Sequence, residues 1–100
     1  MAKGYIIVTQ DVKDRAGLEA YGAAAFPTMM AHKGKPLVVS DNVEAREGGW
    51  HGQRTVVLEF ESLDAAKAWY ESDEYQAVIG MRLDAADCNC AIVEGFEMPG

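Results

Sequence analysis

Four short apolar runs, each typical of a buried β-strand, are spaced along the chain. All four are rich in Val, Ile or Leu, and they are centred on residues 6–8, 37–39, 56–58 and 91–93. Such runs, bounded by turn-forming residues, predict strands. We expect the strands to span residues 5–9, 35–40, 54–60 and 89–96.

The interval after the second apolar run contains turn-forming residues. Asp41-Asn42 predicts a bulge or a bend, after which Val43 to Glu47 could continue the strand. The segment Gly48-Gly49-Trp50-His51-Gly52 predicts a flexible hairpin loop that leads into the third strand.

Apolar residues at helical spacing follow the first and the third strand. Asp14 is the expected N-cap of the first helix, whose apolar side consists of Leu18, Tyr21, Ala25 and Met29. Pro27 should end or kink this helix near its last turns, because proline lacks the amide hydrogen that a helix interior needs. Gly34 in His32-Lys33-Gly34 would allow the left-handed residue that closes a helix.

The second helical region divides into two parts. Ser62 is the expected cap of a helix whose buried side consists of Leu63, Ala66, Trp69 and Tyr70. Asp73 and Gln76 match a capping box and predict a third helix. The inner face of that helix would consist of Tyr75, Val78, Ile79, and Arg82 or Leu83.

The order of elements is therefore β-α-β-β-α(α)-β in a single domain of 100 residues. Two βαβ units with right-handed crossovers form a four-stranded antiparallel sheet with helices on one face. We predict an α+β protein with a ferredoxin-like fold.

The apolar runs also indicate a homodimer. Antiparallel strands with one solvated face alternate between apolar and polar residues, and these strands do not. The uncovered face would expose about five aliphatic side chains, each stabilising by roughly 1.5–3 kcal/mol when buried. We expect a second copy to cover this face, sheet against sheet. The alternative is that these residues only favour the strand conformation on a tolerant surface.

Charge and hydropathy exclude several partners. The formal net charge is −7, so we expect no binding to nucleic acid or to an anionic membrane surface. The chain has no run of roughly 20 apolar residues and no signal-peptide pattern at its start, which predicts a cytoplasmic protein. Cys88 and Cys90 are then expected to stay reduced.

The candidate ligand site lies on the second and third helices. Tyr75 and Arg82 are seven residues apart, which places them on nearly one helical stripe. Together they could hold a carboxylate or an enolate, with Trp69, Ser72 and Tyr70 as further substrate-binding candidates. The alternative is that Arg82 pairs with Glu59 or Asp73 and that the aromatic residues only fill the core.

Two residues are candidates for acid–base catalysis. His32 is the best general base, although a histidine at this position often only complements a helix dipole. Glu59 interrupts an apolar strand, so an inward carboxylate would need a partner such as Arg54 or Arg82. His51 follows Trp50 in the glycine-rich loop, which could close over a ligand or contact the other subunit.

No cofactor is expected. The pair Cys88 and Cys90 supplies only two of the roughly four ligands that a metal needs, and small apolar filler is the better interpretation. The nucleotide-binding and triad motifs are absent, and nothing requires a haem on His32. The leading hypothesis is a cofactor-independent enzyme that acts on a small acidic or aromatic metabolite. The alternatives are a non-catalytic, ligand-binding or stress-related module and a structural partner of other proteins.

One family resemblance covers nearly the whole chain. The segment Val57-Leu58-Glu59-Phe60-Glu61-Ser62 is followed by Ala65-Ala66, Trp69-Tyr70, Ser72, Tyr75-Gln76 and Arg82. With Gly34, Glu47-Gly48, Trp50 and the closing Val93-Glu94-Gly95, this pattern resembles domain of unknown function 1330, within the dimeric α/β-barrel superfamily. The resemblance implies a ferredoxin-like fold and a sheet-to-sheet dimer, but no function. Relatives in the superfamily include cofactor-independent monooxygenases, small-molecule isomerases and haem enzymes, so the fold alone does not define the chemistry.

Overall fold

Four antiparallel strands form one sheet in the order β2-β3-β1-β4. The computed structural model describes residues 2–99. The strands are β1 (Gly4–Val12), β2 (Lys35–Ser40), β3 (Arg54–Phe60) and β4 (Ala86–Glu94). The two middle strands, β3 and β1, are antiparallel neighbours, and the edge strands β2 and β4 pair antiparallel with β3 and β1 respectively. The predicted ferredoxin-like α+β fold is confirmed.

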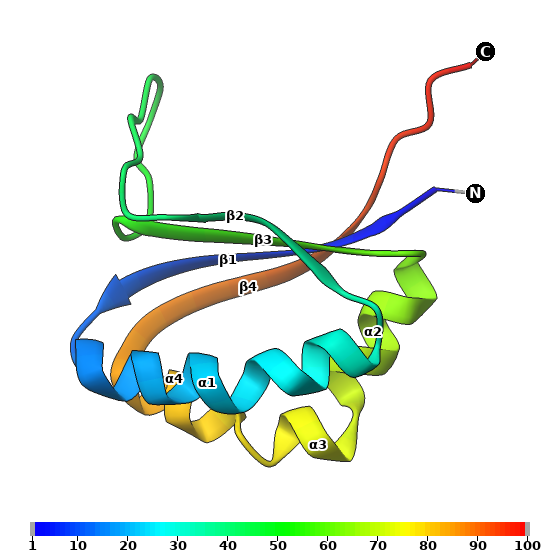
Figure 1. The fold of residues 1–100 in the computed structure, drawn as a ribbon. Helices are drawn as coiled ribbons and strands as arrows, with labels where there is room; N and C mark the ends of the chain where they lie inside the picture. The colour runs from blue at the N-terminus through cyan, green and yellow to red at the C-terminus, as the bar shows by residue number, and fades with distance from the viewer. Residues whose placement is uncertain (1, 100) are drawn as a thin grey trace.

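The helices all lie on one side of this sheet (Figure 1). They are α1 (Arg15–Ala31), α2 (Leu63–Glu71), α3 (Asp73–Gln76) and α4 (Ile79–Ala85). The β2–β3 connection, residues 41–53, and the chain after β4 project from the other side (Figure 1). We call residues 41–53 the arm. No helix among residues 2–99 is both long and apolar enough to span a bilayer.

The first helix begins at the predicted cap and ends at the predicted His32-Lys33-Gly34 stop, but two details near its end differ. The Asp14 side chain accepts a hydrogen bond from the Gly17 amide at 3.0 Å, as an N-cap does. The helix continues through Pro27 to Ala31, so proline does not end it. The left-handed residue at its end is Lys33, with φ 60°, and not Gly34. Gly34 instead allows a close approach, because an added Cβ would lie 2.7 Å from the Phe60 ring.

Serine residues cap the next two helices. Ser62 accepts a hydrogen bond from the Ala65 amide at 3.0 Å and begins α2 as predicted. Ser72, not Asp73, caps α3, because its hydroxyl accepts from the Tyr75 amide at 3.2 Å. The predicted capping box is therefore one residue out of place. The chain leaves the helix at residues 77–78 and continues as α4.

The strands also differ from their predicted bounds. β1 is longer and reaches Val12, and β4 begins three residues early at Ala86. β2 ends at Ser40, and the arm contains no strand. The bulge lies between Pro36 and Val38 and not at Asp41-Asn42.

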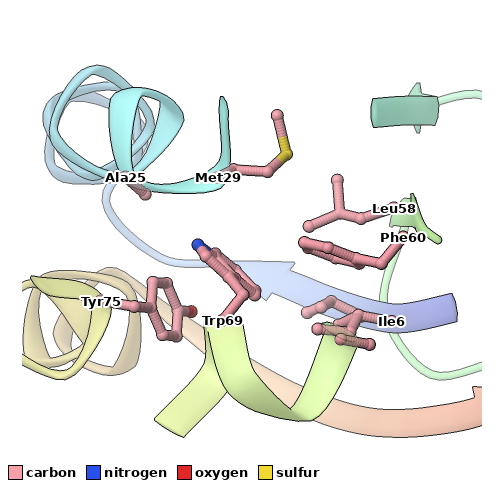
Figure 2. Packing of buried hydrophobic residues seen from close by; sticks show 9 residues of the cluster. Ile6, Ala25, Met29, Leu58, Phe60, Trp69 and Tyr75 are labelled. Atoms are coloured by element: carbon pink, nitrogen blue, oxygen red, sulfur yellow. The ribbon is translucent and has the colours of Figure 1, made fainter. Parts of the chain in front are cut away.

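The core lies between the helices and one face of the sheet. Its buried residues are Ile6, Val8, Ala25, Met29, Leu58, Phe60, Ala66, Trp69 and Tyr75. Trp69 lies between Phe60 and Tyr75, with ring centroids 5.5 Å and 4.0 Å away respectively (Figure 2). This aromatic stack fixes α2 and α3 against the sheet.

We call the other face of the sheet the open face, because no helix covers it (Figure 1). Cross-strand register places an apolar row across the middle of all four strands, formed by Val38, Val57, Ile7 and Ala91. The next row on one side is polar and consists of Ser40, Thr55, Thr9 and Asn89. The strands thus alternate more than the sequence pattern suggests, and the apolar surface is concentrated in the centre.

Candidate functional site

Arg82 is a buried cation without a carboxylate partner. Its residue is only 2% exposed, in the last turn of α4. Its Nε donates to the Tyr75 hydroxyl at 3.3 Å, and its guanidinium carbon lies 6.0 Å from the centre of the Tyr21 ring. No Asp or Glu within residues 2–99 forms an ion pair with it, and this includes both expected partners, Glu59 and Asp73. Buried charges are normally paired, so this arrangement indicates a missing anion.

Two tyrosines complete the surroundings of the guanidinium. The hydroxyl oxygens of Tyr21, from α1, and Tyr75, from α3, are 2.8 Å apart. Burial raises the pKa of both phenols, so both stay neutral at physiological pH. The pKa of Arg82 is raised: burial acts to lower it, but Coulombic attraction to the Tyr75 and Tyr21 phenolates outweighs burial. The guanidinium therefore keeps its charge. The phenolates do not form at physiological pH, where the neutral tyrosines leave this charge without a counter-ion.

These groups line a small cavity between the helices and the sheet. The cavity has a volume of about 50 Å³, and its lining includes Arg82, Tyr75, Tyr70, Trp69, Gln10 and Cys90. The structure thus brings together four of the five predicted substrate-binding residues. The fifth, Ser72, has a structural part, because its hydroxyl donates to the Trp69 carbonyl at 2.7 Å and caps α3.

A larger apolar groove adjoins the cavity. It has a volume of about 160 Å³ and lies between α1 and the strands β2 and β3. Cavity and groove share the lining residues Gln10, Tyr21, Val56, Leu58 and Trp69. At the mouth of the groove, Phe26 is 51% exposed and Val39 is 53% exposed. A ligand could therefore hold a charged group at Arg82 and an apolar body in the groove.

The two predicted acid–base residues lie elsewhere. His32 is the C-cap of α1, and its Nε2 is 3.7 Å from a Glu74 carboxylate oxygen. Glu59 is on the open face, where it accepts a hydrogen bond from the Tyr5 hydroxyl at 2.9 Å. The expected pairing of Glu59 with an arginine is therefore wrong, because register places this side chain on the face opposite the helices. Neither residue lines the cavity or the groove.

Arg54, the other arginine considered for Glu59, lines the groove and bonds to Asp41 at 3.3 Å. His51 attaches the arm to the sheet, because its Nδ1 is 2.8 Å from the Thr9 hydroxyl oxygen and its Nε2 is 3.7 Å from Asp87. It therefore contacts the open face and not the cavity.

Cys88 and Cys90 are free and share the helix-facing side of β4, opposite Gln10 and Val8. Desolvation raises the pKa of the Cys90 thiol, which keeps it protonated. Within residues 2–99, no three His, Cys, Asp or Glu side chains gather closely enough to hold a metal ion.

Sequence reasoning missed one polar residue of the site. Gln10 is only 3% exposed, and its side-chain oxygen has no hydrogen-bond partner among residues 2–99. Alternation from Ile6 and Val8 would have placed it on the inner face, had the first strand been extended beyond Thr9. Tyr21 was recognised only as a core residue, because its contact with Tyr75 joins residues that are 54 positions apart.

A β-α-β-β-α-β chain with helices on one face of its sheet defines a ferredoxin-like α+β protein. Within this class, the chain belongs to the family described as domain of unknown function DUF1330, whose model matches residues 3–96. No curated protein sequence matches the chain significantly.

Solved structures of low sequence identity share the fold. A protein of unknown function from Rhodopseudomonas palustris, RPA0582, has a TM-score of 0.76 and 15% identity, over 97% of this chain and 85% of its own. A dimeric ferredoxin-like protein of unknown function from Bacteroides fragilis NCTC 9343 has a TM-score of 0.59 and 14% identity, over 92% of this chain and 95% of its own. A member of the ethyl tert-butyl ether D (EthD) family from Bacillus halodurans C-125 has a TM-score of 0.62 and 16% identity, over 98% and 100%.

Proposed function

We propose that the protein is a homodimer that binds a small anionic metabolite between its helices and its sheet, with Arg82 as the anion-binding residue. The observation that carries this proposal is the buried guanidinium without a carboxylate partner, at the wall of a cavity. Leaving such a group unpaired destabilises a fold, so it is retained where a ligand supplies the counter-charge. Tyr75, Tyr70 and Trp69 complete the binding wall.

The open face supports the homodimer. Ile7, Val57, Val38 and Ala91 form a row that a second sheet would remove from water, which stabilises by roughly 1.5–3 kcal/mol for each large aliphatic side chain. The arm and the end of the chain project on this same side, where they would contact a partner (Figure 1). The Bacteroides fragilis protein of the same fold is described as dimeric.

The chemistry that the site supports is stabilisation of negative charge. Arg82 and a tyrosine hydroxyl are hydrogen-bond donors in a small cavity with mainly apolar walls, where they would stabilise an enolate or a carboxylate more strongly than water does. This arrangement suits a cofactor-independent enzyme that acts on a small acidic or aromatic metabolite.

A non-catalytic binding module is the second candidate. The observation that favours it is that neither the cavity nor the groove is lined by a carboxylate or an imidazole within residues 2–99. A binding protein needs no such group, whereas proton transfer at neutral pH usually does. Under this alternative the same anion site binds a ligand without converting it.

Thermal unfolding in a panel of small carboxylates tests the binding proposal. A ligand at ten times its Kd stabilises by about 1.4 kcal/mol, which raises the Tm of a domain of this size by several °C. We expect at least one carboxylate to do so for the wild type and for Arg15→Met, a control at a 57% exposed side chain. Arg82→Met should not respond. An equal response of all three proteins would disprove the anion site.

A further inference from the structure

The unpartnered oxygen of Gln10 sets a second requirement on the ligand. Gln10 lies on β1 opposite Arg54 and Cys88, on the helix-facing side of the sheet. Its Oε1 is buried and accepts no hydrogen bond from residues 2–99, and the residue lines both the cavity and the groove. Buried acceptors are nearly always satisfied in native proteins, so this atom indicates a donor on the ligand.

Tyr21, Tyr75 and Arg82 also line the cavity, and they require hydrogen-bond acceptors on the ligand. Tyr21 and Tyr75 carry two hydroxyl hydrogens, and the bond between their oxygens uses only one. Arg82 donates its Nε hydrogen to Tyr75, and its guanidinium also lies beside Tyr21 and Cys88, without a carboxylate. These residues therefore offer donors and a positive charge, while Gln10 offers an acceptor.

A glycine in the middle of α1 keeps the adjoining groove open. Gly22 lines the groove, and a Cβ added there would meet no atom within 4 Å. Glycine weakens a helix interior relative to alanine, and packing does not require it at this position. The groove is otherwise lined mainly by apolar side chains, including Leu18, Ala25, Met29 and Leu58.

We infer that the ligand is an apolar hydroxycarboxylate, in which the hydroxyl lies next to the carboxylate. The carboxylate binds Arg82, the hydroxyl donates to Gln10 Oε1, and a short aliphatic or aromatic body extends into the groove past Gly22. The two polar groups of the ligand must be close together, because a single cavity of about 50 Å³ contains both subsites. The groove, at about 160 Å³, is smaller than the roughly 300–1,000 Å³ of sites for drug-sized ligands, so the body is short. This inference rests on the anion site of the proposed function.

Calorimetric titration with three matched probes tests the ligand class. The probes are 2-hydroxy-4-methylpentanoate, its analogue 4-methylpentanoate without the hydroxyl, and the methyl ester of the hydroxy acid. We expect the hydroxy acid to bind at least tenfold more tightly than either of the others, which corresponds to about 1.4 kcal/mol. The ester should be the weakest, because it has no charge for Arg82.

Variants at Gln10 and Gly22 test the hydroxyl-binding subsite and the groove separately. Gln10→Leu removes the acceptor at similar volume, so the two acids should then bind within about twofold of each other. Gln10→Glu places a carboxylate in the same cavity as Arg82 and should abolish binding of both acids. Gly22→Leu should block the groove and abolish binding of both acids. Its control, Gly80→Leu, is at a glycine of α4 that lines neither the cavity nor the groove and whose added Cβ would also meet no atom within 4 Å, so it should bind like the wild type.

The outcomes distinguish this inference from the function on which it rests. If the two acids bind the wild type equally, and Gln10→Leu changes neither, the hydroxycarboxylate is refuted while the anion site stands. If the ester binds as well as the hydroxy acid, Arg82 is not the anchor and both ideas fail. If no probe binds, this ligand class is overturned, and the wider carboxylate panel decides whether an anion site exists.

Discussion

Replacing Arg82 by Met should make the protein more stable while it removes the anion site. Methionine fills much of the same space with a flexible apolar chain, and it carries no charge that must be desolvated. The hydroxyl of Tyr75 keeps its bond to Tyr21 at 2.8 Å, so the substitution leaves no buried polar atom newly unpaired there. Most substitutions at buried positions destabilise a protein, so a gain in stability here would show that the buried charge of Arg82 is not compensated within the protein.

The magnitude follows from the contacts of the guanidinium. Burying a cation costs several kcal/mol after relaxation. The bond to Tyr75 is long for a charged donor at 3.3 Å and returns about 1.5 kcal/mol. The contact with the Tyr21 ring, at 6.0 Å, is at the limit of a cation–π interaction and stabilises the folded state by about 0.5 kcal/mol. We therefore expect Arg82→Met to raise the free energy of unfolding by about 1–3 kcal/mol.

Urea unfolding at matched protein concentration measures this change, because the stability of a dimer depends on concentration. Arg15→Met is the control and should change stability by no more than about 0.5 kcal/mol, since its side chain is 57% exposed. Arg82→Lys keeps a buried charge and loses the planar donor, so it should show no gain. If Arg82→Met loses 1 kcal/mol or more, the protein itself compensates the charge and the argument for a missing anion fails.

Three further predictions concern the interface, the tyrosines and the packing. Val57→Lys, in the centre of the open face, should yield monomers or insoluble protein in sedimentation runs, and a soluble dimer would place the interface elsewhere. The raised pKa values of Tyr21 and Tyr75 mean that the unfolded chain loses these protons first; stability should be complete below about pH 10 and fall above it, by up to about 1.4 kcal/mol per pH unit for each phenol. Urea unfolding between pH 9 and pH 11 checks this, and Tyr21→Phe should show a shallower fall. Gly34→Ala should destabilise by about 1–3 kcal/mol, because its methyl would meet the Phe60 ring at 2.7 Å, and a thermal melt unchanged from the wild type would contradict that packing.

The fold was predictable because its signals are local. The apolar runs fix the strands, and caps such as Asp14 and Ser62 fix where helices begin. The errors lie where tertiary contacts override local preference. Pro27 stays within α1, since the packing of Ala25 and Met29 against the core holds this helix together on both sides of the proline.

The candidate site was only half predictable. Tyr75 and Arg82 were found from their spacing, although a break at residues 77–78 separates their helices. Gln10 was missed because the predicted first strand ends at Thr9, three residues before the end of β1 at Val12. Glu59 was misplaced because its face depends on the pairing of β3 with β1, which a single apolar run does not reveal.

The irregular strand β2 affects how these sheets can associate. As an edge strand it would normally invite another chain to extend the sheet sideways. Pro36 has no amide hydrogen to offer such a neighbour, and the bulge beside Leu37 interrupts the ladder that a neighbour would have to follow. The opposite edge, β4, carries Asp87 and Glu94 near its ends, which repel their own copies. Sideways polymerisation is thereby discouraged at both edges of the sheet, even though the strands are rich in Val, Ile and Leu.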